Sequence, residues 1–153
     1  MLRRNVLILA AGGLLAQAKV DRGIGKWRFL KEASTYESGQ GPKESRRQWV
    51  KDGDGVKFLH DGTSMAGKPF HTEFTAKYDG KQYPFQGGSL YNSVALFLRS
   101  PDRVDQVFQL DGKVTVEATR TISPDGKRMT IDSRGSLPSG KKFRNLLIYE
   151  RVE

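Results

Sequence analysis

A chain of 153 residues is long enough for one domain that buries its own hydrophobic core. It contains no cysteine, which excludes disulfides, thiolate metal sites, catalytic thiols and the acylated cysteine of a bacterial lipoprotein. A formal net charge of +9 would suit nucleic acid or an anionic surface, but most Lys and Arg residues are scattered singly and no nucleic-acid-binding motif accompanies them. We therefore expect no nucleic-acid partner.

The N-terminus has the three parts of a secretory signal peptide. A basic start (residues 1–4) precedes an apolar run (residues 6–15), and Ala16-Gln17-Ala18 has the small-x-small form of a cleavage site. The apolar run is shorter than the ~20 residues that span a bilayer. We expect residues 1–18 to be removed, leaving a secreted or periplasmic domain of residues 19–153 with no stable membrane span. An uncleaved N-terminal helix or anchor is the alternative.

After this leader, the pattern predicts short strands separated by turns. Residues 25–29 predict a first strand with Trp27 close to its start. The polar stretch from Leu30 to Ser45 predicts a loop with at most one or two helical turns over residues 31–36. Long connections of this kind often act as lids or binding loops.

Alternation of apolar and polar residues then predicts a series of hairpins. The expected strands cover residues 46–51, 56–61, 69–77, 82–86 and 91–99. The turn Asp52-Gly53-Asp54-Gly55 looks like the start of a calcium loop, but the downstream ligands of an EF-hand are missing, so we favour a hairpin. Val94 to Leu98 is apolar on both faces, which predicts that residues 30–45 or a partner cover its outer side.

The last third of the chain predicts four strands joined by three tight turns. The turns are Asp111-Gly112, Pro124-Asp125-Gly126 and Pro138-Ser139-Gly140. Asp-Gly between alternating runs favours a type I′ hairpin, which needs positive φ at both central residues. With about 8–10 short strands and no helix of ordinary length, the sequence predicts an all-β fold, an antiparallel up-and-down (meander) barrel, with a β-sandwich as the alternative.

Five short motifs follow one another along nearly all of the chain after the leader. They are Gly25-Lys26-Trp27, Asp52-Gly-Asp-Gly-Val56, Thr75-Ala-Lys-Tyr-Asp-Gly-Lys-Gln-Tyr-Pro84, Thr119-Arg120 with Ser123-Pro-Asp-Gly-Lys127, and Tyr149-Glu150-Arg151. In order and spacing they resemble the calycin group, namely lipocalins, fatty-acid-binding proteins and above all small exported lipocalin-like barrels of bacteria. The resemblance implies a barrel closed at one end that holds a small apolar or amphipathic molecule without catalysis. It also implies that the first-strand Trp packs against a basic residue from the last part of the chain.

No group of residues has the pattern of a catalytic site. His71 alternates onto the same strand face as Glu73, which predicts a solvated histidine. His60 alternates with Val56 and Phe58 and is expected to point inward at a strand end, as a hydrogen-bonded structural residue. Two histidines without a thiol do not complete a typical zinc site. We therefore expect no enzymatic activity, no cofactor and no metal.

Arg120 is a charged residue on an apolar strand face. That face is formed by Val114, Val116, Ala118 and Ile122. Because burying an unpaired guanidinium is costly, Arg120 must meet a partner inside. It either binds the anionic group of a ligand or stacks on Trp27 near the closed end, a structural position for which Arg151 competes. Trp27 is expected to be buried, whereas Trp49, on a strand with Arg46, Arg47 and Lys51, is expected to matter less.

Two functional hypotheses remain open from the sequence. The first is a barrel that binds a small hydrophobic or amphipathic molecule. Its predicted lining is Phe70, Phe74, Tyr78, Val94, Leu96, Val116, Ala118 and Met129, with Arg120 as a polar contact. The second is a barrel filled by its own side chains, which acts as an interaction or structural module through its outer surface. In either case we expect a monomer or weak dimer.

Overall fold

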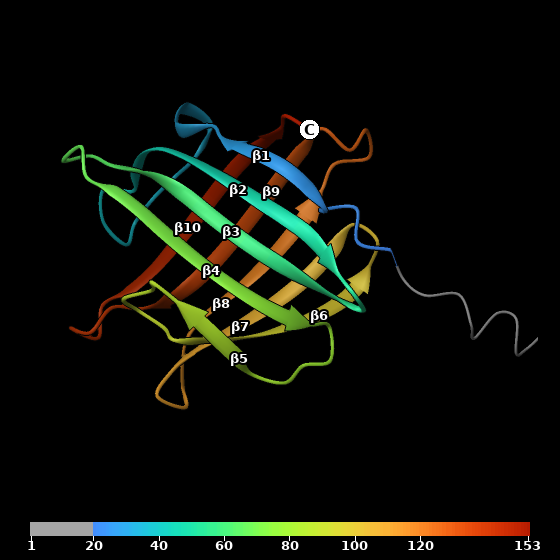
Figure 1. Ribbon diagram of the computed structural model, residues 1–153. Helices are drawn as coiled ribbons and strands as arrows, with labels where there is room; N and C mark the ends of the chain where they lie inside the picture. The colour runs from blue at the N-terminus through green and yellow to red at the C-terminus, as the bar shows by residue number, and fades with distance from the viewer. Residues whose placement is uncertain (1–19) are drawn as a thin grey trace, which may run out of the picture.

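The computed structural model describes residues 20–153, and the predicted signal peptide lies outside this range. Ten antiparallel strands form a closed barrel with almost no helix (Figure 1). The strands are β1 (Gly25–Phe29), β2 (Pro42–Asp52), β3 (Gly55–Ser64), β4 (Pro69–Lys77), β5 (Tyr83–Gln86), β6 (Ser93–Ser100), β7 (Arg103–Leu110), β8 (Lys113–Ile122), β9 (Arg128–Ser136) and β10 (Lys142–Arg151), and one 3-10 turn, η1, covers Lys31–Ala33.

The order of the strands in the barrel follows their order in the chain. Each strand pairs with the next, and β1 closes the barrel by pairing with β10, with Trp27 opposite Arg151. The prediction of an all-β meander barrel is confirmed, and the sandwich alternative is wrong. Asp111 and Gly112 have φ angles of 50° and 85°, so both central residues of that turn adopt the positive φ that a type I′ hairpin requires.

The turn at Asp52-Gly53-Asp54-Gly55 is a hairpin, as the sequence predicts. Asp52 pairs with Gly55, and β2 and β3 continue from there in regular register. Within residues 20–153, no cluster of three His, Cys, Asp or Glu side chains is placed to hold a metal ion. In the same range, no helix is both long and apolar enough to cross a membrane.

The interior is packed largely with aromatic rings. Trp49, Phe58 and Phe74 form one stack, with ring centroids 4.5 Å apart for Trp49 and Phe58 and 4.9 Å for Phe58 and Phe74. From the sequence we expect Trp49 to contribute less to stability than Trp27, because its strand is rich in basic residues. Its environment contradicts this expectation, because the side chain is only 1% exposed. On β2 the inward face carries Ser45, Arg47 and Trp49, so two polar residues share the face of the buried indole.

Two other local expectations are also wrong. The segment before β2 does not cover β6: Thr35 pairs with Leu146 of β10, and Asn145 of β10 accepts a hydrogen bond from the backbone N–H of Glu37. On β8, Val114 does not share the buried face of Val116, since it is 45% exposed. The register between β7 and β8 shifts at Thr115, between Val114 and Val116, which turns the side chain of Val114 outward.

The outer side of β6 is covered locally instead. The ring of Phe97 lies next to Gly80, where an added Cβ would come within 2.6 Å of it. The guanidinium of Arg99 lies over the same ring, 4.9 Å from its centroid. The connection before β5 and a charged neighbour therefore account for the apolar outer face that the sequence shows.

The two ends of the barrel differ. The base, at the right of Figure 1, carries the turns after β2, β4, β6 and β8 and is crossed by residues 20–24. Backbone hydrogen bonding ties this segment down, with the N–H of Arg22 donating to the carbonyl of Pro101 at 2.8 Å. The mouth, at the left, carries the turns after β3, β5, β7 and β9 and the long connection between β1 and β2. The closed base leaves the mouth as the end at which a ligand can enter.

Candidate ligand-binding cavity

At the base, Arg120 is fully buried and paired with a carboxylate of the chain itself. Its Nη2 donates to Asp21 Oδ1, and its guanidinium lies over the ring of Trp49, 4.4 Å from the centroid. Asp21 also accepts hydrogen bonds from the hydroxyl of Tyr78 at 2.5 Å and from the backbone N–H of Gly23 at 2.8 Å. Burial raises the pKa of Tyr78, with a further contribution from Asp21, so its hydroxyl stays protonated and can donate. These contacts close the base.

Arg151, not Arg120, stacks on Trp27. Its guanidinium lies 4.3 Å from the indole centroid and donates to the carbonyls of Gly126, Ile24 and Arg22. The Trp27 indole is completely buried. The prediction that Arg120 stacks on Trp27 is wrong, since Arg120 uses Trp49 and Asp21. Its contact with a ligand stays a prediction, and the geometry favours the structural role.

A cavity of about 360 Å³ opens at the mouth, and two smaller ones of about 90 Å³ and about 20 Å³ lie deeper in the barrel. All three share Arg47 and Tyr91 as lining residues, so they adjoin one another, and we call them together the mouth cavity. Its outer part is lined by Tyr36, Arg47, His60, Phe70, Thr72, Phe85, Leu90 and Tyr91, together with backbone and small side chains of residues 41–42, 64 and 87–89. Its deeper parts add Gln106, Phe108, Ser133 and Asn145, among others.

Among the residues that line the mouth cavity, Arg47 is the charged one and no carboxylate is present. Burial lowers the pKa of His60 well below its ordinary value, and the nearby Arg47 lowers it further, so the imidazole is neutral at pH 7. Burial raises the pKa of Tyr91 to about 12 and also raises that of Tyr36, so both hydroxyls stay protonated. The cavity therefore has aromatic walls, neutral polar groups and one positive charge.

Replacing Arg47 by methionine should raise the pKa of His60. The substitution removes a like charge that disfavours the imidazolium, while the effect of burial remains, so the pKa moves upward and stays below its ordinary value. Titration of the His60 ring protons by NMR measures the shift. The matched control is Arg46→Met on the outer face of the same strand, which should leave His60 unchanged; equal shifts in both variants would contradict the placement of Arg47.

The structure divides the predicted lining residues into two groups. Phe70, Phe74, Val116 and Ala118 line the mouth cavity. Val94, Leu96 and Met129 are fully buried core residues, and Tyr78 lies at the base. As binding residues, all eight stay predictions. The sequence reasoning missed Arg47, Thr72, Tyr91 and Gln106. For His60 it predicted the inward orientation correctly, but the expected hydrogen bonding is wrong for Nε2, which has no partner among residues 20–153.

The hairpin turn between β2 and β3 already indicates in the sequence that Arg47 points inward beside His60. Because Asp52 pairs with Gly55, counting back along both strands places Arg47 opposite His60.

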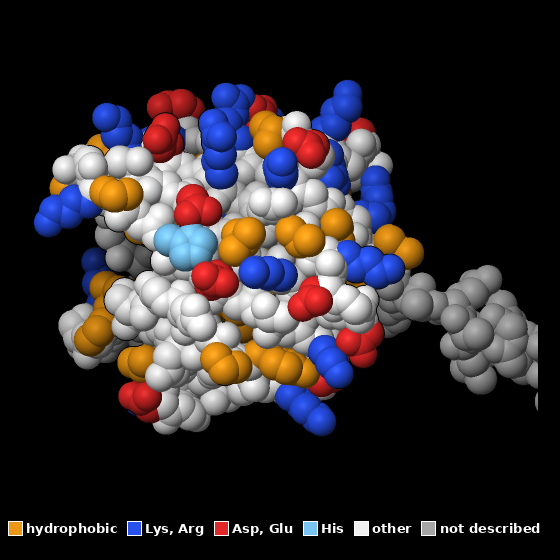
Figure 2. All heavy atoms as spheres, in the orientation of Figure 1, with side chains coloured by type: hydrophobic (Ala, Val, Ile, Leu, Met, Phe, Trp, Pro, Cys, Tyr) orange, Lys and Arg blue, Asp and Glu red, His pale blue; other side chains and the backbone are white. Residues whose placement is uncertain are grey.

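His71, by contrast, lies on the outer face as predicted. Its ring nitrogens lie 2.6 Å from Asp61 and 3.1 Å from Glu73. Those hydrogen bonds raise the pKa of His71. Figure 2 shows a histidine side chain on the surface with acidic side chains beside it.

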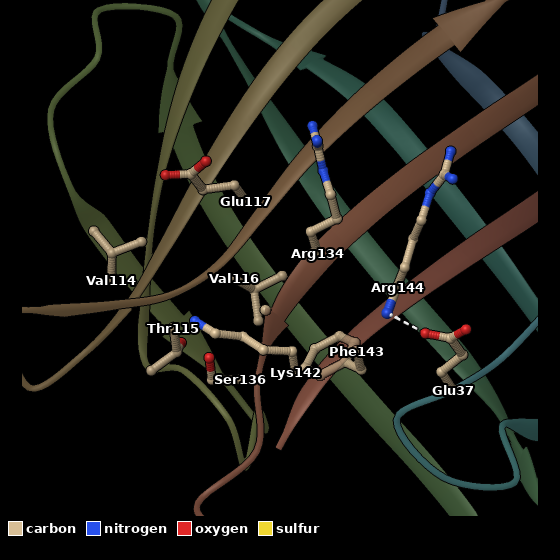
Figure 3. A pocket seen from close by; sticks show the side chains of 11 residues that line it. Glu37, Val114, Thr115, Val116, Glu117, Arg134, Ser136, Lys142, Phe143 and Arg144 are labelled. Atoms are coloured by element: carbon tan, nitrogen blue, oxygen red, sulfur yellow. Dashed lines mark hydrogen bonds between the residues drawn. The ribbon is translucent and has the colours of Figure 1, made fainter. Parts of the chain in front are cut away.

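A separate depression of about 520 Å³ lies at the mouth ends of β8, β9 and β10 (Figure 3). The exposed side chains of Arg134, Lys142 and Arg144 surround it. Arg144 is held in place, since its backbone N–H donates to Glu37 at 2.7 Å and its guanidinium donates twice to Asp132. This depression is on the outer surface, and Arg144 is already paired with residues of the chain itself. The mouth cavity is therefore the better candidate for a binding site.

No family model matches this sequence, and no curated protein matches it. Among solved structures, it is similar to zebrafish ileal bile acid-binding protein complexed with cholic acid, with a TM-score of 0.54 and 15% identity over 86% of this chain and 100% of that chain. It also matches the siderocalin Ex-FABP, with a TM-score of 0.40 and 14% identity over 86% of this chain and 71% of that chain. The fold is an antiparallel closed β-barrel of the kind that fatty-acid-binding proteins and lipocalins adopt.

Proposed function

We propose that this protein is a non-catalytic barrel that binds a small hydrophobic or amphipathic molecule in the mouth cavity. The observation that carries the proposal is the cavity itself: a volume of about 360 Å³, inside the range of small-molecule sites, with aromatic walls and a few converging polar groups. A barrel of the same fold, the zebrafish protein, is a bile acid-binding protein. Aromatic rings fill the barrel below the cavity, so the ligand occupies the mouth half.

The filled-barrel alternative has one observation in its favour. The deeper cavities, of about 90 Å³ and about 20 Å³, hold only a few water molecules, so the lower half has no room for a ligand. In that case the protein acts as an interaction or structural module through its outer surface.

Native mass spectrometry of protein purified from its own host separates the two functions. We expect a small molecule to co-purify with the protein and to be released when the protein is denatured. The released molecule should displace a fluorescent amphipathic probe from the barrel. A mass equal to that of the polypeptide alone, with no binding of any amphipathic probe, would contradict the binding function and favour the module.

We also propose export to the periplasm or the cell exterior. The support is the basic start, the apolar run and Ala16-Gln17-Ala18, after which cleavage leaves Lys19 at the new N-terminus. N-terminal sequencing of the protein from the host's exported fraction should begin at Lys19. A sequence that begins at Met1 would overturn both the cleavage and the proposed localisation.

A further inference from the structure

Three inward side chains lie in one row across neighbouring strands at the mouth cavity. Arg47 of β2 pairs directly with His60 of β3, and His60 pairs directly with Thr72 of β4. Directly opposed residues on one face of an antiparallel pair have Cβ atoms about 4.5–5.5 Å apart. All three line the mouth cavity, so they can contact a single small group.

The row has hydrogen-bonding capacity that the chain does not use. Arg47 Nε, His60 Nε2 and Thr72 Oγ1 are buried and have no hydrogen-bond partner among residues 20–153. The indole N–H of Trp49, two residues further along β2 on the same face, is also buried without a hydrogen-bond partner. Such groups are normally satisfied, because a buried polar atom without a partner destabilises the fold. All four can donate a hydrogen bond, so the group that satisfies them is an acceptor.

The charge of the row points to an anionic acceptor. The barrel supplies Asp21 to Arg120 at its base, yet no carboxylate lines the cavity around Arg47. The guanidinium carbon of Arg47 lies over two aromatic faces, 5.4 Å from the centroid of Phe58 and 5.0 Å from that of Tyr149. Its planar fork is suited to a carboxylate, which accepts two parallel hydrogen bonds.

We propose that the ligand of the mouth cavity carries an acidic group, which binds to Arg47, His60 and Thr72. The inference rests on the proposed binding function and adds the chemical class and orientation of the ligand. Arg47 lines both the outer and the deeper parts of the cavity, so the acidic group lies at its floor. The apolar body extends toward the mouth, against Phe70 and Tyr91. A deprotonated acid with a short apolar body fits this arrangement.

A matched pair of fluorescent probes with short bodies tests the proposal: dansylglycine and its methyl ester. The wild type should bind the acid about tenfold or more tightly than the ester, the ratio expected for a charged hydrogen bond. Arg47→Met should abolish that preference by weakening the acid about tenfold or more, with the ester changed less than about twofold. Arg47→Lys keeps the charge without the planar fork and should recover only part of the acid affinity.

The control is Arg46→Met, which removes the same formal charge from the exposed face of the same strand. It should leave both affinities within about twofold of the wild type, because an exposed charge is screened by salt. Equal losses of acid binding in Arg46→Met and Arg47→Met would mean that net charge, not contact, selects the acid, and would overturn the proposal.

The remaining outcomes are distinct. If acid and ester bind the wild type equally, or if Arg47→Met changes neither, the barrel binds ligands but has no acid anchor at Arg47. If neither probe binds the wild type, the proposed function itself fails, and the inference with it. Near-ultraviolet circular dichroism confirms that each variant keeps the packed aromatic core, so that a loss of binding is not a loss of fold.

Discussion

Replacing Trp49 by alanine should lower the free energy of unfolding by about 3–5 kcal/mol, the range for removing a large aromatic side chain from a core. The indole is 1% exposed, and its ring centroid lies 4.5 Å from that of Phe58. The Arg120 guanidinium also lies over this ring, so the substitution removes a cation–π contact together with the packing. Urea denaturation of wild type and variant, with equal m-values, measures the change.

The matched control for this prediction is Val50→Ala. Val50 is the next residue on β2 but points outward and is 37% exposed, so its replacement should change stability by less than about 0.5 kcal/mol. Trp27→Ala, on the neighbouring strand β1, should cost as much as Trp49→Ala, since Trp27 is also completely buried and carries the Arg151 stack. A change as small as that of Val50→Ala would place Trp49 on the surface.

The strands and turns were predictable because their signals are local. Asp111-Gly112 predicts a hairpin because these two residues tolerate the positive φ that the turn needs. The alternation around Phe74 or Ala118 indicates a buried face within a single strand, whatever strand lies beside it. From such strands one can predict that the sheet closes into a barrel, but not which strands pair to close it. The pairing of β1 with β10 depends on contacts between the two ends of the chain, which no local pattern encodes.

The inward face of β2 was not predictable from alternation alone. Adjacent Arg46 and Arg47 look like one exposed basic cluster, although they point to opposite faces. The buried Trp49 marks the inward face, and Arg47 shares it. A period of two identifies a buried face only when that face is apolar, so a strand that carries a polar row into a cavity gives a weak signal.

The partner of Arg120 could not be identified for a different reason. Its burial follows from the apolar register of β8, but Asp21 lies 99 residues earlier, in the segment before β1. Asp21 belongs to no predicted strand and sits three residues after the expected cleavage site. Long-range pairing of this kind depends on where the closed barrel places its base, which is a property of the whole fold.

Breaking the ion pair at the base should destabilise the fold as much as removing a core indole. Asp21→Asn leaves the Arg120 guanidinium fully buried without a carboxylate, which should lower the free energy of unfolding by about 3–5 kcal/mol. Arg120→Met should cost less, because Asp21 keeps its hydrogen bonds from Tyr78 and Gly23. The double variant should be more stable than Asp21→Asn alone, since the uncompensated charge is gone.

Denaturation of the two single variants and the double variant measures this coupling, with Asp102→Asn as the control. Asp102 pairs with Arg22 close to Asp21 in the same base, but it is half exposed, so its loss should cost less than about 1 kcal/mol. Each variant that stays folded should bind an amphipathic acid within about twofold of the wild type, because Arg120 lies at the base and the mouth cavity is lined by Arg47. A loss of acid binding in Arg120→Met, with Arg47→Met unaffected, would move the anion site to the base and make Arg120 the ligand contact.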